Sequence, residues 1–94
     1  MQTDQRTAVE RMPDGSVWVW HGRDGARRLT RMWYARGAIL GQSLQPGPAT
    51  IERLVGRSQL EAAVGEELAR EVMGRLGIPT AERTDGRFLE RAPA

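Results

Sequence analysis

Few residues in this chain could support catalysis. The sequence contains one histidine, His21, and no cysteine, which excludes a cysteine nucleophile, a thiolate metal site and disulfide bonds. A serine triad needs a histidine within hydrogen-bond reach of both a hydroxyl and a carboxylate. We expect His21 at the end of a strand, beside Ala8 and Arg28, where the guanidinium disfavours the imidazolium that a general base must become. The sequence therefore predicts no catalytic residue and no enzymatic activity.

The sequence also predicts neither a metal site nor a small-molecule cofactor. No second histidine accompanies His21, and the carboxylates show no calcium-loop spacing. The 11 glycines occur singly, so none of the glycine-rich nucleotide motifs is formed. No apolar run approaches the roughly 18 residues of a membrane span, and residues 1–6 lack the apolar stretch of a signal peptide. We expect a cytoplasmic protein without a membrane partner.

Aromatic and cationic side chains offer a binding surface instead. The candidate binding residues are Trp18, Trp20, Trp33, Arg11, Arg28 and Arg31. Trp and Arg contribute most to the energetics of protein interfaces. The leading hypothesis is a small non-enzymatic protein that acts through protein–protein contacts, as a regulator, adaptor or mobile-element inhibitor, and forms a homodimer. The alternative is nucleic-acid binding, because Arg and Trp also hold phosphates and stack on bases.

Charge is distributed unevenly along the chain. All 14 cationic residues are Arg, and 12 carboxylates oppose them for a net charge of +2. Residues 1–50 carry a net +3, whereas residues 51–94 carry −1. The basic excess is concentrated at Arg23, Arg27, Arg28, Arg31 and Arg36, and it could attract phosphates or an acidic protein surface, or protect a strand edge from pairing. The absence of Lys is typical of GC-rich coding, which suggests a bacterium or a phage.

Two Asp-Gly turns, at 14–15 and 24–25, predict an antiparallel meander with strands at 7–12, 16–22 and 26–35. If both turns are two-residue loops, Trp18 pairs with Arg11 and Arg31, and Trp20 pairs with Val9 and Leu29. One face then carries Val9, Trp18, Trp20, Leu29 and Trp33 with Arg11 and Arg31. The other face carries Met12, Val17, Val19, Met32 and Tyr34 with Glu10, His21 and Arg28.

Both predicted faces are apolar, so both need a cover, and the chain has helix enough for one. The sequence leaves open whether the Trp face packs on the long helix or forms an interface. Either way one apolar face remains, unless residues 35–55 fold over it. We therefore expect a partner protein or a second copy of this chain.

The C-terminal half predicts helices. Residues 35–43 suggest a fourth strand, 45–48 a loop and 49–55 a short helix. A capping box formed by Ser58 and Glu61 starts a helix over 59–76 that ends at Gly77. Its apolar stripe is Leu60, Val64, Leu68, Val72 and Leu76. Within it, Gly65 and Gly74 suggest that another backbone packs closely there.

Residues 80–91 predict a hairpin around Asp85-Gly86, or a frayed tail. The predicted fold is thus a single α+β domain over 1–94: a three- to four-stranded antiparallel meander (7–43), a loop (45–48), a helical part (49–77) with one long helix and one short one, and a C-terminal hairpin or tail (80–94). The two helices and this hairpin, with Arg83, Arg87 and Arg91, superficially resemble a winged helix-turn-helix. Four carboxylates on the outer surface of the long helix, at Glu61, Glu66, Glu67 and Glu71, would repel phosphates and disfavour that version of nucleic-acid binding.

Overall fold

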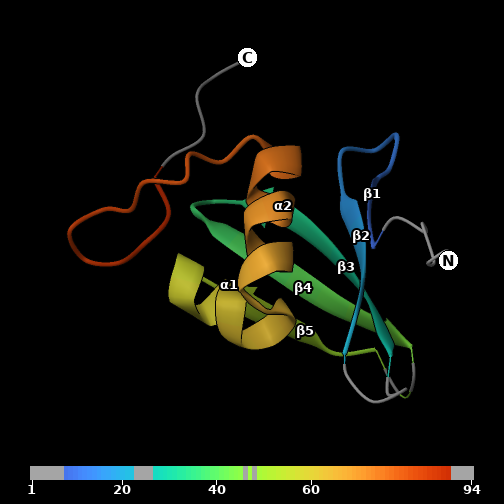
Figure 1. Cartoon of the computed structure of the whole chain (residues 1–94). Coiled ribbons are helices and arrows are strands. Elements are labelled where there is room, and N and C mark those ends of the chain that lie inside the picture. Colours follow the sequence, from blue (N-terminus) through green and yellow to red (C-terminus); the bar gives the residue numbers. More distant parts are fainter. Residues whose placement is uncertain (1–7, 23–26, 46, 48, 90–94) are drawn as a thin grey trace, which may run out of the picture.

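The computed structural model describes residues 8–22, 27–45, 47 and 49–89. The chain forms an α+β fold in which a five-stranded antiparallel meander precedes two helices (Figure 1). The strands are β1 (Val9–Arg11), β2 (Val17–His21), β3 (Arg28–Ala35), β4 (Ala38–Gln45) and β5 (Ile51–Leu54), and they lie side by side in chain order. The helices are α1 (Arg57–Val64) and α2 (Glu66–Leu76). The α+β meander is confirmed, with five strands where three to four were predicted, and the two helices differ from the predicted pair at 49–55 and 59–76.

The first hairpin corrects the predicted register by one residue. Val9 pairs with Val19, and Arg11 pairs with Val17. The loop has three residues, 13–15, because the Met12 amide donates to the Ser16 carbonyl at 2.8 Å. Gly15 takes a positive φ of 89°, as the third residue of such a loop requires. Because strand side chains alternate between faces, this shift moves Val9 and Arg11 off the face that carries Trp18.

The second hairpin has the predicted register. Trp18 pairs with Arg31 and Trp20 with Leu29, although the Asp24-Gly25 turn itself lies outside the described residues. The fourth strand is also confirmed, and Ala35 pairs with Ala38 across a two-residue turn. Arg36 and Gly37 in that turn both have positive φ, 53° and 79°, which is the backbone of a type I′ hairpin.

The predicted short helix at 49–55 is wrong. Residues Ile51–Leu54 form β5, which pairs antiparallel with β4 through Ile39–Leu54 and Gln42–Ile51. The Ser43 amide donates to the Thr50 carbonyl at 2.9 Å beside the connecting loop, whose residues 46 and 48 lie outside the description. Residues 38–54 therefore widen the sheet instead of folding over one of its faces.

The predicted long helix is two helices, because the backbone turns at Gly65, with φ 93° and ψ 160°. The capping box is also wrong: Gly56 is the N-cap of α1 without a side-chain cap, and Ser58 lies inside the first turn. The predicted end is confirmed, since Gly77 is the left-handed C-cap of α2. No atom lies within 4 Å of a Cβ built at Gly65 or Gly74, so the close approach expected at these glycines is absent.

The close backbone approach occurs at Gly56. A Cβ there would collide with the carbonyl oxygen of Gly86. Gly56 forms an isolated bridge with Arg87, and the Phe88 amide donates to the Val55 carbonyl at 3.0 Å. The described part of the C-terminal segment, up to residue 89, contains isolated bridges but no hairpin of strands. This segment nevertheless contributes Phe88, whose side chain is 3% exposed, to the hydrophobic core.

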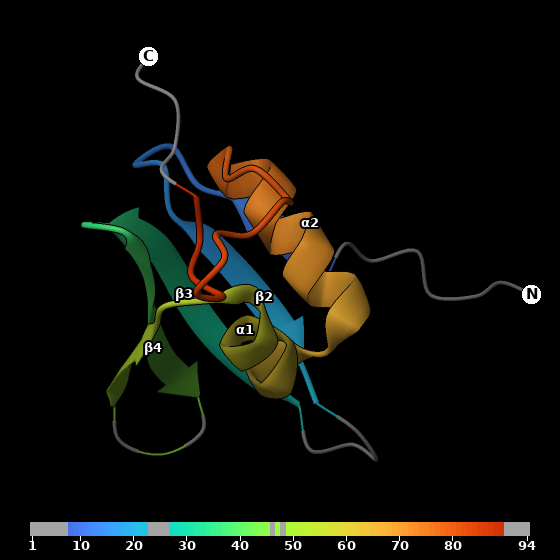
Figure 2. The ribbon, with the colours of Figure 1, turned by 90° about the vertical axis from the view of Figure 1, so that its left-hand side faces the viewer.

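Both helices pack on the same face of the sheet (Figures 1 and 2). We call this the covered face; its strand residues in the core are Val9, Val17, Val19, Met32, Ile39 and Leu54. They meet Leu60 of α1 and Val72 and Met73 of α2, all at most 1% exposed. No described helix covers the opposite face, which we call the open face; its apolar residues are Trp18, Trp20, Leu29, Trp33, Leu40 and Ile51.

Candidate functional site

The open face brings together three of the predicted tryptophans and one of the predicted arginines. Trp18 and Trp20 come from β2, and Trp33 and Arg31 from β3. Trp18 and Arg31 are direct partners, and Trp33 follows two residues after Arg31, so all point to one side of the pleat. This side is the one without a helix. The tryptophans predicted to form an aromatic surface therefore lie on the side of the sheet that no described helix covers.

Arg11 and Arg28, the other two predicted binding residues, do not join this cluster. Arg11 is opposite Val17, and Arg28 is opposite His21, so both belong to the side of the sheet that carries the helices. The misplacement of Arg11 follows from the one-residue shift in the first hairpin. Arg28 was already expected on that second face.

Two guanidinium groups lie over tryptophan rings. The Cζ of Arg31 is 4.6 Å from the centre of a Trp33 ring, and the Cζ of Arg27 is 5.7 Å from that of Trp20. Both distances fall within the range of cation–π attraction. The three tryptophans are half-buried. The result is an aromatic surface on which two of the rings lie next to a cation.

Asp14 holds Arg31 in this position. Its Oδ2 accepts a hydrogen bond from Arg31 Nη2 at 3.2 Å. Its Oδ1 accepts from the Ser16 hydroxyl at 2.6 Å and from the Ser16 amide at 2.9 Å. The two Ser16 bonds, followed by the weaker effect of Arg31, lower the pKa of Asp14 to about 2. Asp14 is thus ionised at neutral pH and offsets the charge of Arg31.

Three further residues of the open face were not among the predicted binding residues. Leu40 pairs with Trp33 and with Arg53, and Ile51 is 62% exposed, an unusually high value for an apolar side chain. Ile51 and Arg53 were assigned to a helix, where they would not face Trp33. The apolar residues Ile51 and Leu54 are three positions apart, a spacing that favours a helix, so the local pattern gave no strand signal for Ile51 and Arg53.

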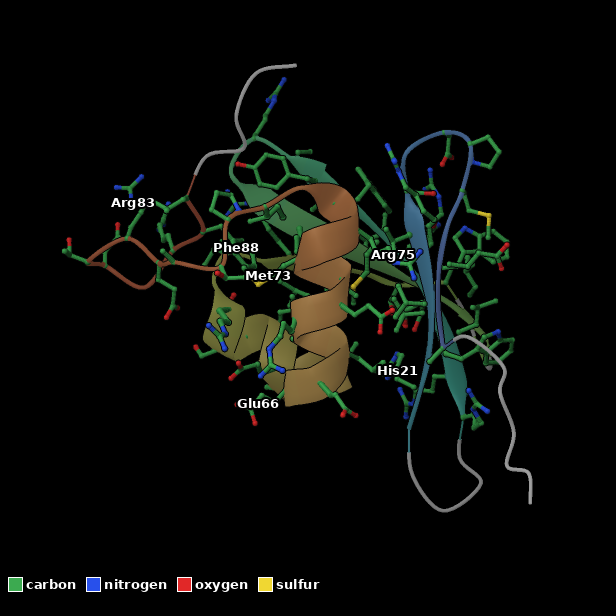
Figure 3. All side chains as sticks on the ribbon, turned by 45° about the horizontal axis from the view of Figure 1, so that its top comes forward. His21, Glu66, Met73, Arg75, Arg83 and Phe88 are labelled. Atoms are coloured by element: carbon green, nitrogen blue, oxygen red, sulfur yellow. The ribbon has the colours of Figure 1, made fainter. Side chains whose placement is uncertain are left out.

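His21 lies at the end of β2, on the side of the sheet that the helices cover (Figure 3). Its Nε2 is 2.8 Å from the Thr30 hydroxyl oxygen. Burial lowers the pKa of His21, and the charge of Arg28, which was expected from the sequence, lowers it further. The predicted neighbour Ala8 is one residue off, because its carbonyl accepts from Trp20.

A small cavity of about 50 Å³ adjoins His21. Its polar lining comprises His21, Thr30, Ser43, Thr50 and Glu52. The Thr30 hydroxyl has an imidazole partner, but within the described ranges no carboxylate is hydrogen-bonded to His21. A hydroxyl nucleophile would need both the imidazole and a carboxylate that orients it. The arrangement supplies a hydrogen bond between two neighbouring strands.

The described residues contain no group of three or more His, Cys, Asp or Glu side chains that could hold a metal ion. Their helices are too short to cross a membrane as apolar spans. The sequence matches no protein-family model, and no curated protein or solved structure is significantly similar to it. The geometry of the two sheet faces is therefore the feature of this chain that indicates a function.

Proposed function

We propose that this chain is a non-enzymatic binding protein that acts through protein–protein contacts at the open face. The observation that carries the proposal is the placement of both helices on one face, which leaves Trp18, Trp20, Trp33 and Leu40 uncovered. Large aromatic side chains backed by Arg are the residues that contribute most when a protein interface forms. A regulator, adaptor or inhibitor of a mobile element would use such a surface without chemistry.

Charge favours a protein over a nucleic acid as the partner. Arg11 and Arg28 belong to the other side of the sheet and Arg31 is paired with Asp14, which leaves Arg27 and Arg53 as the described cations of the open face that a phosphate backbone could use. Glu10, the partner of Trp18, adds a negative charge to the open face. The helix-turn-helix alternative required a helix at residues 49–55, and residues 51–54 form a strand instead. Nucleic-acid binding by the Arg/Trp surface remains the second candidate.

Site-specific photocrosslinking tests the proposal. A photoreactive amino acid replaces Gln42, the half-buried neighbour of Arg31 at the centre of the open face, in the cells that naturally make the chain. The matched control carries the same amino acid at Glu67, an exposed position of α2. We expect protein adducts at position 42 and none at 67. Nuclease-sensitive adducts at 42, or equal labelling at both positions, would overturn the proposal.

Salt-dependent binding provides a second, independent readout. The purified chain is titrated against labelled single-stranded RNA, single-stranded DNA and duplex DNA at low and physiological salt. We expect no binding that weakens in proportion to a few neutralised phosphates. Binding with that salt dependence, lost on Trp18→Ala in a variant that remains folded, would make the open face a nucleic-acid site.

A further inference from the structure

We propose that the occupant of the open face is a second copy of this chain, packed sheet against sheet about a twofold axis that runs along the strands. The inference rests on the proposed protein-binding function and names the partner and its orientation. Three properties of the open face carry it: its size, its charge pattern from edge to edge, and the composition of its centre.

The size of the open face allows a homodimer with a small interface. Four intervals of about 4.8 Å between neighbouring strands give a width of about 19 Å, and β3 and β4, with eight residues each, extend about 27 Å, whereas β1 and β5 have three and four residues. The footprint of the strands is therefore roughly 450 Å² before the relief of the side chains is added, which is smaller than the roughly 800 Å² per partner of a standard interface. Two twisted sheets can pack face to face at about 30° with their side chains interdigitated.

The two edges of the open face carry opposite charges. Glu10 lies on β1 at one edge, as the partner of Trp18, and Arg53 lies on β5 at the other, as the partner of Leu40. Both residues are exposed, and neither forms an ion pair within the described part of the chain. Each is therefore available to a partner that presents the opposite charge at the facing edge.

This charge pattern selects one of the two twofold arrangements. An axis perpendicular to the strands would place β1 over β1 and β5 over β5, so that Glu10 meets Glu10 and Arg53 meets Arg53. An axis along the strands places β1 of one copy over β5 of the other, so that Glu10 approaches Arg53 of the second copy twice. Arg53 is two residues, about 7 Å, from Ile51, the residue that lies in the same row as Glu10, and a long Arg side chain spans that offset.

The centre of the face is compatible with self-association. Arg31 lies on the central strand, near the axis, where two copies of it approach each other. Its charge is offset by Asp14 and its guanidinium lies over Trp33, so the pair presents a nearly neutral aromatic surface. The tryptophans and Leu40 then supply the apolar contact on both sides.

Charge reversal at the two edges tests the partner and the orientation together. Sedimentation velocity over a concentration series measures the dimer dissociation constant of the wild type, Glu10→Arg, Arg53→Glu and the double variant. Each single variant should weaken the dimer about tenfold, because two attractive contacts become repulsive. The double variant should recover the wild-type constant, and an equimolar mixture of the two single variants should form a heterodimer. Arg70→Glu, on an exposed turn of α2, is the matched charge control and should change nothing.

Tryptophan fluorescence reports whether the open face itself is buried. All three tryptophans of the chain lie on this face, so acrylamide quenching should fall as the concentration rises through the dissociation constant. A chain that stays monomeric overturns the dimer, and crosslinks from position 42 to another protein would still support the proposed function. A dimer with unchanged quenching, or without rescue in the double variant, overturns the assigned face or orientation.

Discussion

The two faces of the sheet use different kinds of apolar side chain. The covered face is built from Val9, Val17, Val19, Met32 and Ile39, which are at most 1% exposed. The open face is built mainly from tryptophans that are half-buried and in two cases lie under a guanidinium. Aliphatic side chains fit the closely packed layer between strands and helices, whereas tryptophan and arginine tolerate partial exposure and bind strongly when a partner removes the remaining water.

Both faces carry large apolar side chains. The difference lies in side-chain type and in what the rest of the chain can reach. Leu29 of the open face is 5% exposed, yet it does not belong to the core cluster that contacts the helices. Side chains of the open face therefore bury one another only in part, and a second sheet packed on them could bury the rest.

The largest difference in stability is expected between variants of Ile39 and Leu40, two adjacent residues of β4 that lie on opposite faces of the sheet. Ile39→Ala removes a fully buried side chain from the covered face and should cost about 2–5 kcal/mol of unfolding free energy. Leu40→Ala, on the open face, should cost about 1 kcal/mol because the side chain is half-buried. Urea unfolding of both variants, at a concentration where the chain is monomeric, measures the contrast. Equal losses would contradict the distinction between the faces.

The next effect concerns how the C-terminal segment completes the covered face. Gly56→Ala places a methyl group against the Gly86 carbonyl and should cost about 1–3 kcal/mol. Gly74→Ala is the matched control: its Cβ meets no other atom in an exposed position of α2, so it should stabilise the chain by about 0.5–1 kcal/mol. Thermal unfolding of the two variants should shift in opposite directions. A neutral Gly56→Ala would show that the segment near Phe88 can detach without loss.

A smaller, pH-dependent effect should come from His21. Its pKa is lowered in the folded chain, first by burial and then by Arg28, so the folded state binds a proton less readily than the unfolded state. Stability should therefore be full above the ordinary value of 6.5 and fall as the pH decreases through 6.5 toward the lowered pKa. Urea unfolding of wild type and His21→Gln at pH 8 and pH 5 isolates this contribution. A difference between the two proteins that is independent of pH would contradict it.

The smallest effect is expected at Asp14, which is exposed on the rim of the open face. Its pKa is lowered from 3.8 to about 2, so its contribution to stability is present above pH 3.8 and is lost as the pH falls through 2. Unfolding of Asp14→Asn should lack this acid-dependent loss, and Asp14→Asn should also reduce the fixation of Arg31. NMR titration of the Asp14 carboxyl carbon provides the direct check; an ordinary midpoint near 3.8 would remove the argument that Ser16 and Arg31 hold this carboxylate.

The sequence predicted the meander because its signals are local. Val17–His21 has strong strand composition, and the register between β2 and β3 follows from the spacing of the second Asp-Gly turn. The first hairpin differed because a three-residue loop beginning at Pro13 also satisfies an Asp-Gly signal. Loop length is decided by backbone geometry at Gly15, and one residue reverses every side chain of the short β1.

The C-terminal half was harder to predict because tertiary pairing competes with local pattern. Residues 51–54 become a strand because they pair with the free edge of β4, although the spacing of their own apolar residues favours a helix. The stripe from Leu60 to Leu76 does face the core, but Gly65 divides it into two helices. For the candidate site, Trp18, Trp20, Trp33 and Arg31 followed from alternation alone. Leu40, Ile51 and Arg53 required the five-stranded topology.

The chain-order topology of the sheet has a consequence for how quickly the molecule folds. Each described strand pairs with its immediate neighbour in sequence, so the sheet can grow hairpin by hairpin from the tight turn at Arg36-Gly37. Short loops close with little entropic cost, and topologies dominated by such local contacts fold fast. The contact between segments that are far apart in the sequence is the docking of α2 on β1 and β2. We expect this docking to be the late step, so that the aromatic face exists before the helices complete the core behind it.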